Sequence, residues 1–61
     1  QRLRSLTDRE REVLEHLLKG KLNKEIAVDL NVSQRTIEAH RARIREKTRT
    51  RGIVDLIRML G

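Results

Sequence analysis

A basic stretch between Ser33 and Arg51 holds the residues with the clearest potential for chemistry, because arginine, glutamate and alanine recur there at helical spacing. Arginine can donate two hydrogen bonds to the edge of guanine, glutamate can accept one from cytosine N4, and alanine can contact a thymine methyl group. At about 100° per residue, one outward helical face would carry Arg35, Glu38, Ala39, Ala42, Arg43 and Glu46. These types predict a surface that reads the major groove of DNA, with base contacts from Glu38, Ala39, Ala42, Arg35 and Arg43.

Two short helices joined by a tight turn, from Asn23 to Ala42, would position this surface. The first helix has an apolar stripe that ends at Asn31, a residue that tolerates the left-handed backbone of a sharp helix exit. Ser33 follows where the next helix needs an N-cap. Ile37 and Ile44 then return the second helix to the same core. The pattern is typical of a helix-turn-helix, whose second helix enters the major groove.

Positive charge is concentrated in the same region. Residues 33–51 contain seven Lys and Arg against two Glu, a balance of +5 within a net charge of +6 for the chain. Residues 7–19 have a balance of −1. A run of charge usually marks only a solvated face, but its coincidence with a helix-turn-helix favours a polyanion as the partner.

Phosphate contacts are expected from the rim of this surface. Asn23 and Lys24 begin the first helix of the pair, where free amides and the positive end of the helix dipole favour an anion. Asn23 and Ser33 are also ordinary capping residues, and the two roles are compatible. The residues assigned to phosphate are Asn23, Lys24, Ser33, Gln34, Thr36, Arg45 and Lys47.

Four helices are predicted, at about residues 8–19, 24–30, 34–49 and 53–60. Thr7 and Glu10 have the spacing of a capping box at the start of the first helix, and Gly20 ends it. Gly52 separates the third helix from an apolar fourth. We therefore expect an all-α protein, a compact four-helix bundle that contains a helix-turn-helix and has a short C-terminal fourth helix. Residues 1–5 are assigned to the remnant of an interdomain linker and residues 6–61 to the domain.

Composition narrows the possible classes. The 61 residues suffice for one small domain. The chain has no cysteine, hence no disulfide framework, and no aromatic residue to stack on the bases of single strands or RNA. No apolar run approaches membrane-spanning length and no signal peptide is present, so we expect a cytoplasmic protein with no membrane partner. Since the chain begins with Gln1 rather than Met, we expect it to be part of a longer protein.

The two histidines raise the question of an enzyme. His16 lies among acidic and basic residues of the first helix and is expected to face solvent, and His40 lies beside the apolar stripe of the third. Glu12 and His16 would supply only two ligands to a metal ion. The chain has no paired nucleophile and base and no glycine-rich phosphate loop. We therefore expect no catalysis, no metal site and no cofactor.

A resemblance to a known family extends over nearly the whole chain. The matching features are Leu6-Thr7, Arg9-Glu10, Val13-Leu14, Gly20, Asn23-Lys24, Ile26-Ala27, Leu30, Ser33, Arg35-Thr36, Glu38, His40 and Lys47. In this order and at these spacings the chain resembles the LuxR-type DNA-binding domain, particularly the FixJ/NarL branch of response regulators. The resemblance implies a four-helix transcription regulator that binds double-stranded DNA as a dimer, preceded by a receiver domain or, less often, an autoinducer-binding domain. It also implies base reading at Glu38, Ala39 and Ala42.

The fourth helix has two interpretations. Its apolar residues are nearly continuous, so they either close a small core or also form a partner surface. The family resemblance implies dimerisation here, which we assign to Val54, Ile57 and Arg58. Leu or Met is usual in the family where Thr48 stands, and a Ser-like cap where Gly52 stands. We therefore expect poorer packing near Thr48 and a frayed start of the fourth helix, which would leave an isolated chain monomeric.

Two classes of function remain open. The first is sequence-specific binding of double-stranded DNA, as the output domain of a bacterial two-component response regulator, with a homodimer on DNA and RNA polymerase as a further candidate partner. The second is a helical protein-interaction module that docks on an acidic partner. A sigma-factor-like promoter-reading domain is a neighbour of the first class. Binding to duplex DNA at several salt concentrations separates the two.

Overall fold

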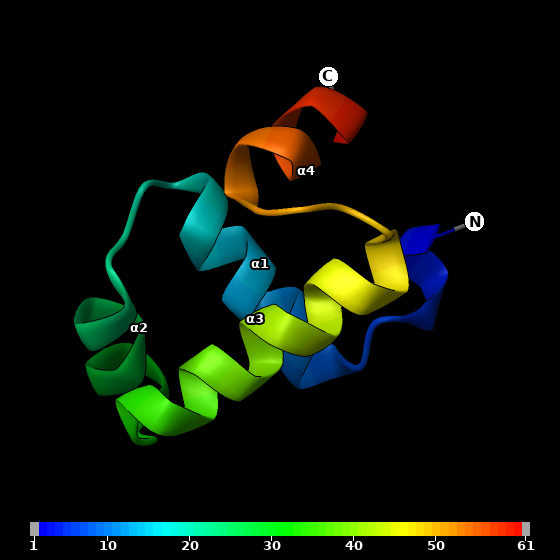
Figure 1. Cartoon of the computed structure of the whole chain (residues 1–61). Coiled ribbons are helices and arrows are strands. Elements are labelled where there is room, and N and C mark those ends of the chain that lie inside the picture. The colour runs from blue at the N-terminus through cyan, green and yellow to red at the C-terminus, as the bar shows by residue number, and fades with distance from the viewer. Residues whose placement is uncertain (1, 61) are drawn as a thin grey trace.

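The computed structural model describes residues 2–60, and every element of secondary structure in that range is a helix (Figure 1). A short 3-10 helix, η1, precedes four α-helices, and the bounds are η1 Arg2–Ser5, α1 Asp8–Leu18, α2 Asn23–Leu30, α3 Gln34–Thr48 and α4 Ile53–Leu60. The all-α fold with four helices is confirmed. The observed helices differ from the predicted ranges by one residue at an end of α1, α2 and α3.

Local capping explains where α1 begins and ends. The Glu10 amide donates to Thr7 Oγ1 at 3.1 Å, and the Thr7 amide donates to Glu10 Oε1 at 3.0 Å. This reciprocal pair satisfies two amides that have no acceptor within the helix. After α1, Gly20 has φ 82°, a left-handed conformation that suits glycine. The predicted capping box is therefore confirmed.

The turn between α2 and α3 has the predicted geometry. Asn31 adopts φ 58° and ψ 46°, and the Val32 amide donates to the Ala27 carbonyl at 2.9 Å across the helix end. Ser33 Oγ then accepts from the Thr36 amide at 3.1 Å and caps α3. Because these bonds reverse the chain within three residues, α3 crosses in front of α1 and beside α2 (Figure 1).

The start of α2 differs from the prediction. Asn23 does not cap the helix, because it is already the first helical residue and Leu22 is the N-cap. The side chain of Leu22 accepts no hydrogen bond from the helix; instead the Leu22 amide donates to Glu25 Oε1 at 2.7 Å. The side chain of Asn23 is thereby released from a capping role and contacts α3.

One apolar core joins all four α-helices. α3 packs against both α1 and α2, while α4 contacts α1. Ala27 is almost fully buried, and its small side chain lets α2 approach the core closely. The buried apolar residues are Leu6, Val13, Leu14, Leu17, Ile26, Ala27, Ile37, Ile44 and Leu56. α4 thus contributes one buried residue and is the most lightly attached helix.

The expected loose packing at Thr48 is wrong. Thr48 is fully buried, and its hydroxyl donates to the Ile44 carbonyl at 2.6 Å and lies 2.9 Å from Thr50 Oγ1. A buried hydroxyl is tolerated when it has such partners. Arg49 follows with φ 58° and ends α3 one residue earlier than expected.

Residues 2–5, which were assigned to a linker remnant from the sequence, form a short 3-10 helix that contacts the domain. η1 packs against α3, and Leu3 lies against the core. The Leu3 carbonyl accepts from the Leu6 amide at 3.3 Å and from Arg11 Nη2 at 3.0 Å. Gln1, also assigned to the linker, lies outside the described residues. No helix among residues 2–60 is long and apolar enough to cross a membrane.

Candidate nucleic-acid interface

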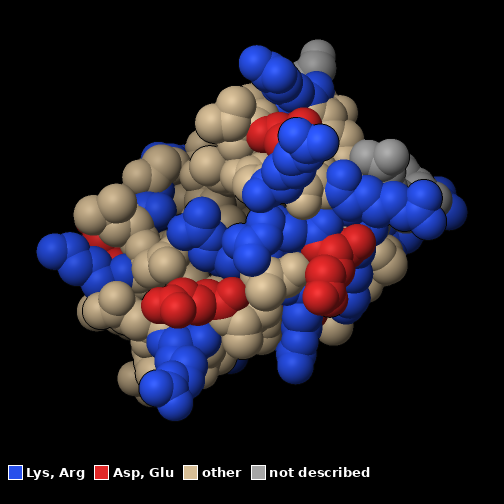
Figure 2. Space-filling view, viewed as in Figure 1, with Lys and Arg blue, Asp and Glu red and all other residues tan. Residues whose placement is uncertain are grey.

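The outward face of α3 presents most of the predicted base-reading side chains. Arg35, Glu38, Ala39 and Arg43 are exposed, while Ala42 is half-buried. Within residues 2–60, neither arginine has an acidic partner at ion-pair distance, and Glu38 has no basic one. Figure 2 shows Lys and Arg side chains over much of the face that α3 crosses, with Asp and Glu in small separate patches. This face therefore combines free hydrogen-bonding groups with positive charge.

The first turn of α3 adds polar groups beside that face. Ser33 and Gln34 are exposed and Thr36 is half-buried. The Ser33 and Thr36 hydroxyl oxygens lie 3.0 Å apart, and either can donate to the other. Ser33 Oγ also accepts from the Thr36 amide. Since only one of the two hydroxyl hydrogens is used between Ser33 and Thr36, the other can be donated to an outside acceptor. The first amides of the helix lack intrahelical acceptors as well.

The start of α2 meets α3 at a polar junction. Arg41 Nη1 donates to Asn23 Oδ1 at 2.7 Å. A shallow hollow at this junction is lined by Asn23, Glu38, Arg41 and Arg45. Lys24, the next residue of α2, is exposed and forms no ion pair with another residue in 2–60. The helix start and the α3 face thus form one continuous surface that can meet an anion.

Lys47 has a structural partner that sequence spacing did not indicate. Its Nζ lies 2.7 Å from Glu10 Oε1, and the Glu10 side chain is 2% exposed. Burial raises the pKa of Glu10, but the hydrogen bonds from Lys47 and Thr7 outweigh burial and hold this pKa below its ordinary value. The ion pair joins the start of α1 to the end of α3. Glu10 and Lys47 are 37 residues apart, so no local pattern reveals the contact.

Sequence reasoning did not assign Arg41 to the interface. Helical periodicity places it on the core side of α3 with Ile37 and Ile44, and its side chain is half-buried. Its guanidinium nevertheless reaches the junction with α2. A charged residue at a core-side position is the signal that points to such a cross-helix contact.

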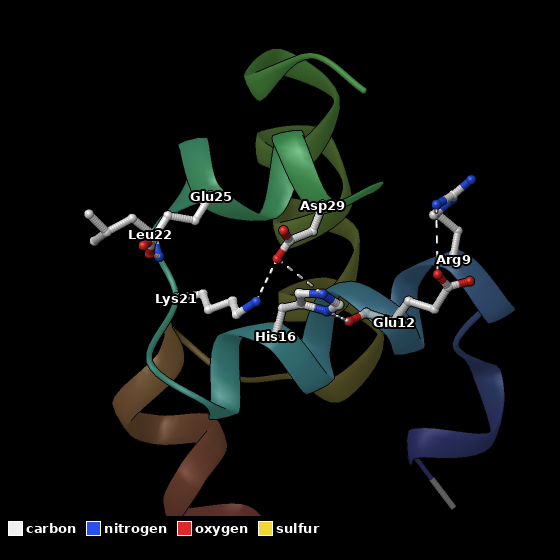
Figure 3. A network of polar contacts seen from close by, with 7 residues as sticks. All are labelled: Arg9, Glu12, His16, Lys21, Leu22, Glu25 and Asp29. Carbon is white, nitrogen blue, oxygen red and sulfur yellow. Dashed lines mark hydrogen bonds and ion pairs between the residues drawn. The ribbon is translucent and has the colours of Figure 1, made fainter. Parts of the chain in front are cut away.

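A network between α1 and α2 corrects the expectation that His16 faces solvent (Figure 3). His16 Nδ1 lies 2.8 Å from the Glu12 carbonyl oxygen, and Nε2 lies 3.6 Å from Asp29 Oδ2. The hydrogen bond from Lys21 holds the pKa of Asp29 below its ordinary value. His40 on α3 is half-buried, and its Nδ1 has no hydrogen-bond partner among residues 2–60.

Neither histidine belongs to a metal cluster in the described part of the chain, where no three His, Asp or Glu side chains are grouped to hold an ion. The network of His16, Lys21 and Asp29 therefore connects two helices by ordinary polar contacts.

α4 exposes the residues assigned to dimerisation. Val54 is 64% exposed and Ile57 is 50% exposed, and Arg58 is also exposed. Ile57 borders a groove that continues over Leu18 and Leu22 and also reaches Lys24 and Gln34. The structure thus places the three assigned residues on the surface of one short helix.

Comparison with known proteins supplies the family. A family model described as "Bacterial regulatory proteins, luxR family" matches residues 4–60. The transcriptional regulatory protein FixJ of Rhizobium meliloti is 45% identical over 58 residues, which cover 95% of this chain and 28% of that protein. The tetrathionate response regulatory protein TtrR of Salmonella typhimurium is 45% identical over 53 residues, 87% of this chain and 26% of TtrR. The response regulator protein TodT of Pseudomonas putida is 42% identical over 55 residues, 90% and 24% of the two chains.

No solved structure gives a significant match. The chain spans about a quarter of the length of the curated relatives described above. The family match nevertheless covers residues 4–60 and agrees with the helix-turn-helix of α2 and α3. The chain therefore belongs to the luxR family of bacterial regulatory proteins, as a DNA-binding domain whose relatives are transcriptional response regulators.

Proposed function

We propose that this domain binds double-stranded DNA sequence-specifically and is the output domain of a bacterial two-component response regulator. The observation that carries this proposal is the outward face of α3, where Arg35, Glu38 and Arg43 are exposed and have no partner for ion pairing within residues 2–60. Polar groups left free on a protruding helix can exchange water for base edges without first breaking an internal contact.

Binding would proceed through two kinds of contact. The rim of Lys24, Gln34 and Arg45, with the Ser33–Thr36 hydroxyl pair and the first amides of α2 and α3, would hold phosphates and set the register of α3 in the groove. Glu38 and Ala39 lie centrally on the exposed face and would read bases together with the flanking arginines. The half-buried Ala42 would allow close approach of α3 to the bases. Lys47 would contribute less, since Glu10 already holds it.

Dimer formation through α4 completes the proposal. Val54, Ile57 and Arg58 on two copies would face one another, so that each copy places α3 in one half-site of an inverted repeat. RNA polymerase is a further candidate partner of the DNA-bound dimer. This part of the proposal rests on the exposed apolar surface of α4 and on the regulatory names of the relatives.

The direct test is selection of preferred sequences from a pool of random duplexes, followed by titration of the selected duplex at several salt concentrations. We expect one enriched sequence, and an affinity that falls steeply with salt because phosphate contacts release counterions. The absence of binding to any duplex at low salt, together with tight binding to an acidic protein, would favour the interaction module instead.

A further inference from the structure

The contact between Arg41 and Asn23 joins the reading helix to the first residue of the helix before it. Arg41 Nη1 donates to Asn23 Oδ1 at 2.7 Å across a partly buried junction. Both side chains are half-buried, and Arg41 lies on the face of α3 that otherwise carries the buried Ile37 and Ile44. A guanidinium at such a position costs desolvation, so its placement needs a partner, and Asn23 supplies one.

The contact also determines how the Asn23 amide is oriented. A guanidinium has five N–H donors and no acceptor, so the Asn23 atom that faces it must be the oxygen. The two hydrogens of the Asn23 NH₂ group are therefore left for another acceptor. None of the described residues accepts them. Asn23 lines the same hollow as Glu38 and Arg45, one proposed base reader and one proposed phosphate contact.

We propose that Arg41 is a positioning residue: it holds the Asn23 amide in the orientation that presents its NH₂ group to a DNA phosphate. The proposal rests on the DNA-binding function proposed above. Without Arg41, the amide can rotate and present its oxygen to the phosphate, which repels it. Since the same bond spans α2 and α3, the phosphate contact is also fixed relative to the base-reading face.

A double-mutant cycle tests this coupling. The four proteins are the unaltered chain, Asn23→Ala, Arg41→Met and the double variant, each titrated by fluorescence anisotropy against the selected duplex. We expect each single substitution to weaken binding about tenfold, the scale of one hydrogen bond to a charged group. If Arg41 acts through Asn23, Arg41→Met causes no further loss in the Asn23→Ala background. If the two losses multiply, Arg41 acts independently of Asn23 and the proposal is overturned.

Two further variants separate positioning from folding. Asn23→Asp keeps an oxygen for Arg41 and turns the contact into an ion pair, but it removes the donor and adds a negative charge beside the phosphate. We expect Asn23→Asp to melt no lower than the unaltered chain and yet to bind DNA more weakly than Asn23→Ala. An affinity of Asn23→Asp equal to or above that of Asn23→Ala would show that Asn23 does not face a phosphate, and would overturn the proposal.

Arg41→Lys retains a cationic donor group and should recover part of the affinity that Arg41→Met loses. Equal affinities of the two variants would count against positioning by a donor. DNA binding by the unaltered chain distinguishes a failure of the proposed function from a failure of the positioning role alone. If it binds no duplex at low salt, the proposed function fails and the positioning role with it. If it binds but the cycle shows independent effects, only the positioning role fails.

Discussion

Basic residues of α3 differ in the internal contacts that a bound phosphate would have to break. Arg45 is exposed and has no acidic partner among residues 2–60, so it can meet a phosphate directly. Lys47, two positions later, is held by the buried carboxylate of Glu10, and a phosphate would compete with that ion pair. Arg41 is engaged by a neutral amide. At the scale of single residues, the exposed basic side chains should therefore dominate the salt dependence of DNA binding.

Substitution of Glu38 should change which sequence is preferred. Glu38 is the exposed acidic residue at the centre of the α3 face, and a carboxylate that accepts from cytosine N4 disfavours other bases there. We expect Glu38→Ala to lose discrimination at one base pair by roughly 1–3 kcal/mol, measured by repeating the sequence selection with the variant. An unchanged preferred sequence would show that Glu38 does not read a base.

Substitution of Lys24 should weaken binding to all sequences alike. Its exposed ammonium lies at the start of α2, where it can contact a phosphate but carries no information about the base. We expect Lys24→Ala to reduce the slope of log affinity against log salt by about one. Arg9→Ala on α1 is the matched control, because Arg9 is exposed and paired with Glu12 outside the proposed interface. Equal slopes for the two variants would remove Lys24 from the phosphate contacts.

At the scale of elements, the carboxylate of Glu10 connects the start of α1 with the end of α3. The pKa of Glu10 is held below its ordinary value in the fold, so the unfolded chain binds the proton more readily. The resulting stabilisation is present above the ordinary pKa of a glutamate and is lost as the pH falls through the lower pKa of the folded state.

This linkage predicts the effect of Glu10→Gln. The amide keeps the shape of the side chain but loses the charge that binds Lys47, so we expect a loss of about 1–3 kcal/mol in the free energy of unfolding at pH 7. We also expect the variant to lose less stability than the unaltered chain between about pH 5 and the acid limit, measured by urea unfolding at several pH values. Glu12→Gln, at an exposed ion pair with Arg9, should leave the acid dependence nearly unchanged. Parallel acid profiles for Glu10→Gln and the unaltered chain would contradict the assignment.

Local signals and contacts between elements differ in how far the sequence reveals them. The cap at Thr7, the left-handed Asn31 and the cap at Ser33 act over three or four residues, and the sequence predicts all of them correctly. Asn23 is misassigned as a cap because its actual partner, Arg41, lies 18 residues away. Contacts at such separations depend on helix packing, which no local pattern encodes. The base-reading assignments stay predictions, since a base contact can be observed only in a complex with DNA.

At the scale of the whole molecule, α4 is attached differently from the other helices. Leu56 is its one buried residue, whereas Val54 is 64% exposed and Ile57 is 50% exposed. An apolar surface kept outside a core this small does little for the stability of the monomer. In the dimer proposed above, burial of this surface between two copies would add the contacts that the monomer lacks.

Substitution of Ile57 should separate dimer formation from folding. A carboxylate in the middle of the proposed dimer surface would be desolvated by the second copy, so Ile57→Asp should abolish cooperative binding to an inverted repeat while binding to a single half-site persists. Val28→Asp is the control, since Val28 is 79% exposed on α2 and outside α4. The two variants would be compared on both duplexes by gel-shift titration and by sedimentation on DNA. Cooperative binding retained in Ile57→Asp would place the dimer contact elsewhere.

The dual engagement of Glu10 also bears on cooperativity. One carboxylate closes the first turn of α1 through Thr7 and holds Lys47 at the end of α3. Fraying of α1 would therefore remove the partner of Lys47, so that loosening of the first turn of α1 and of the end of α3 is coupled. In hydrogen exchange, the first protected amides of α1 should open together with those at the end of α3, so that the two segments form one unfolding unit while α4 opens separately.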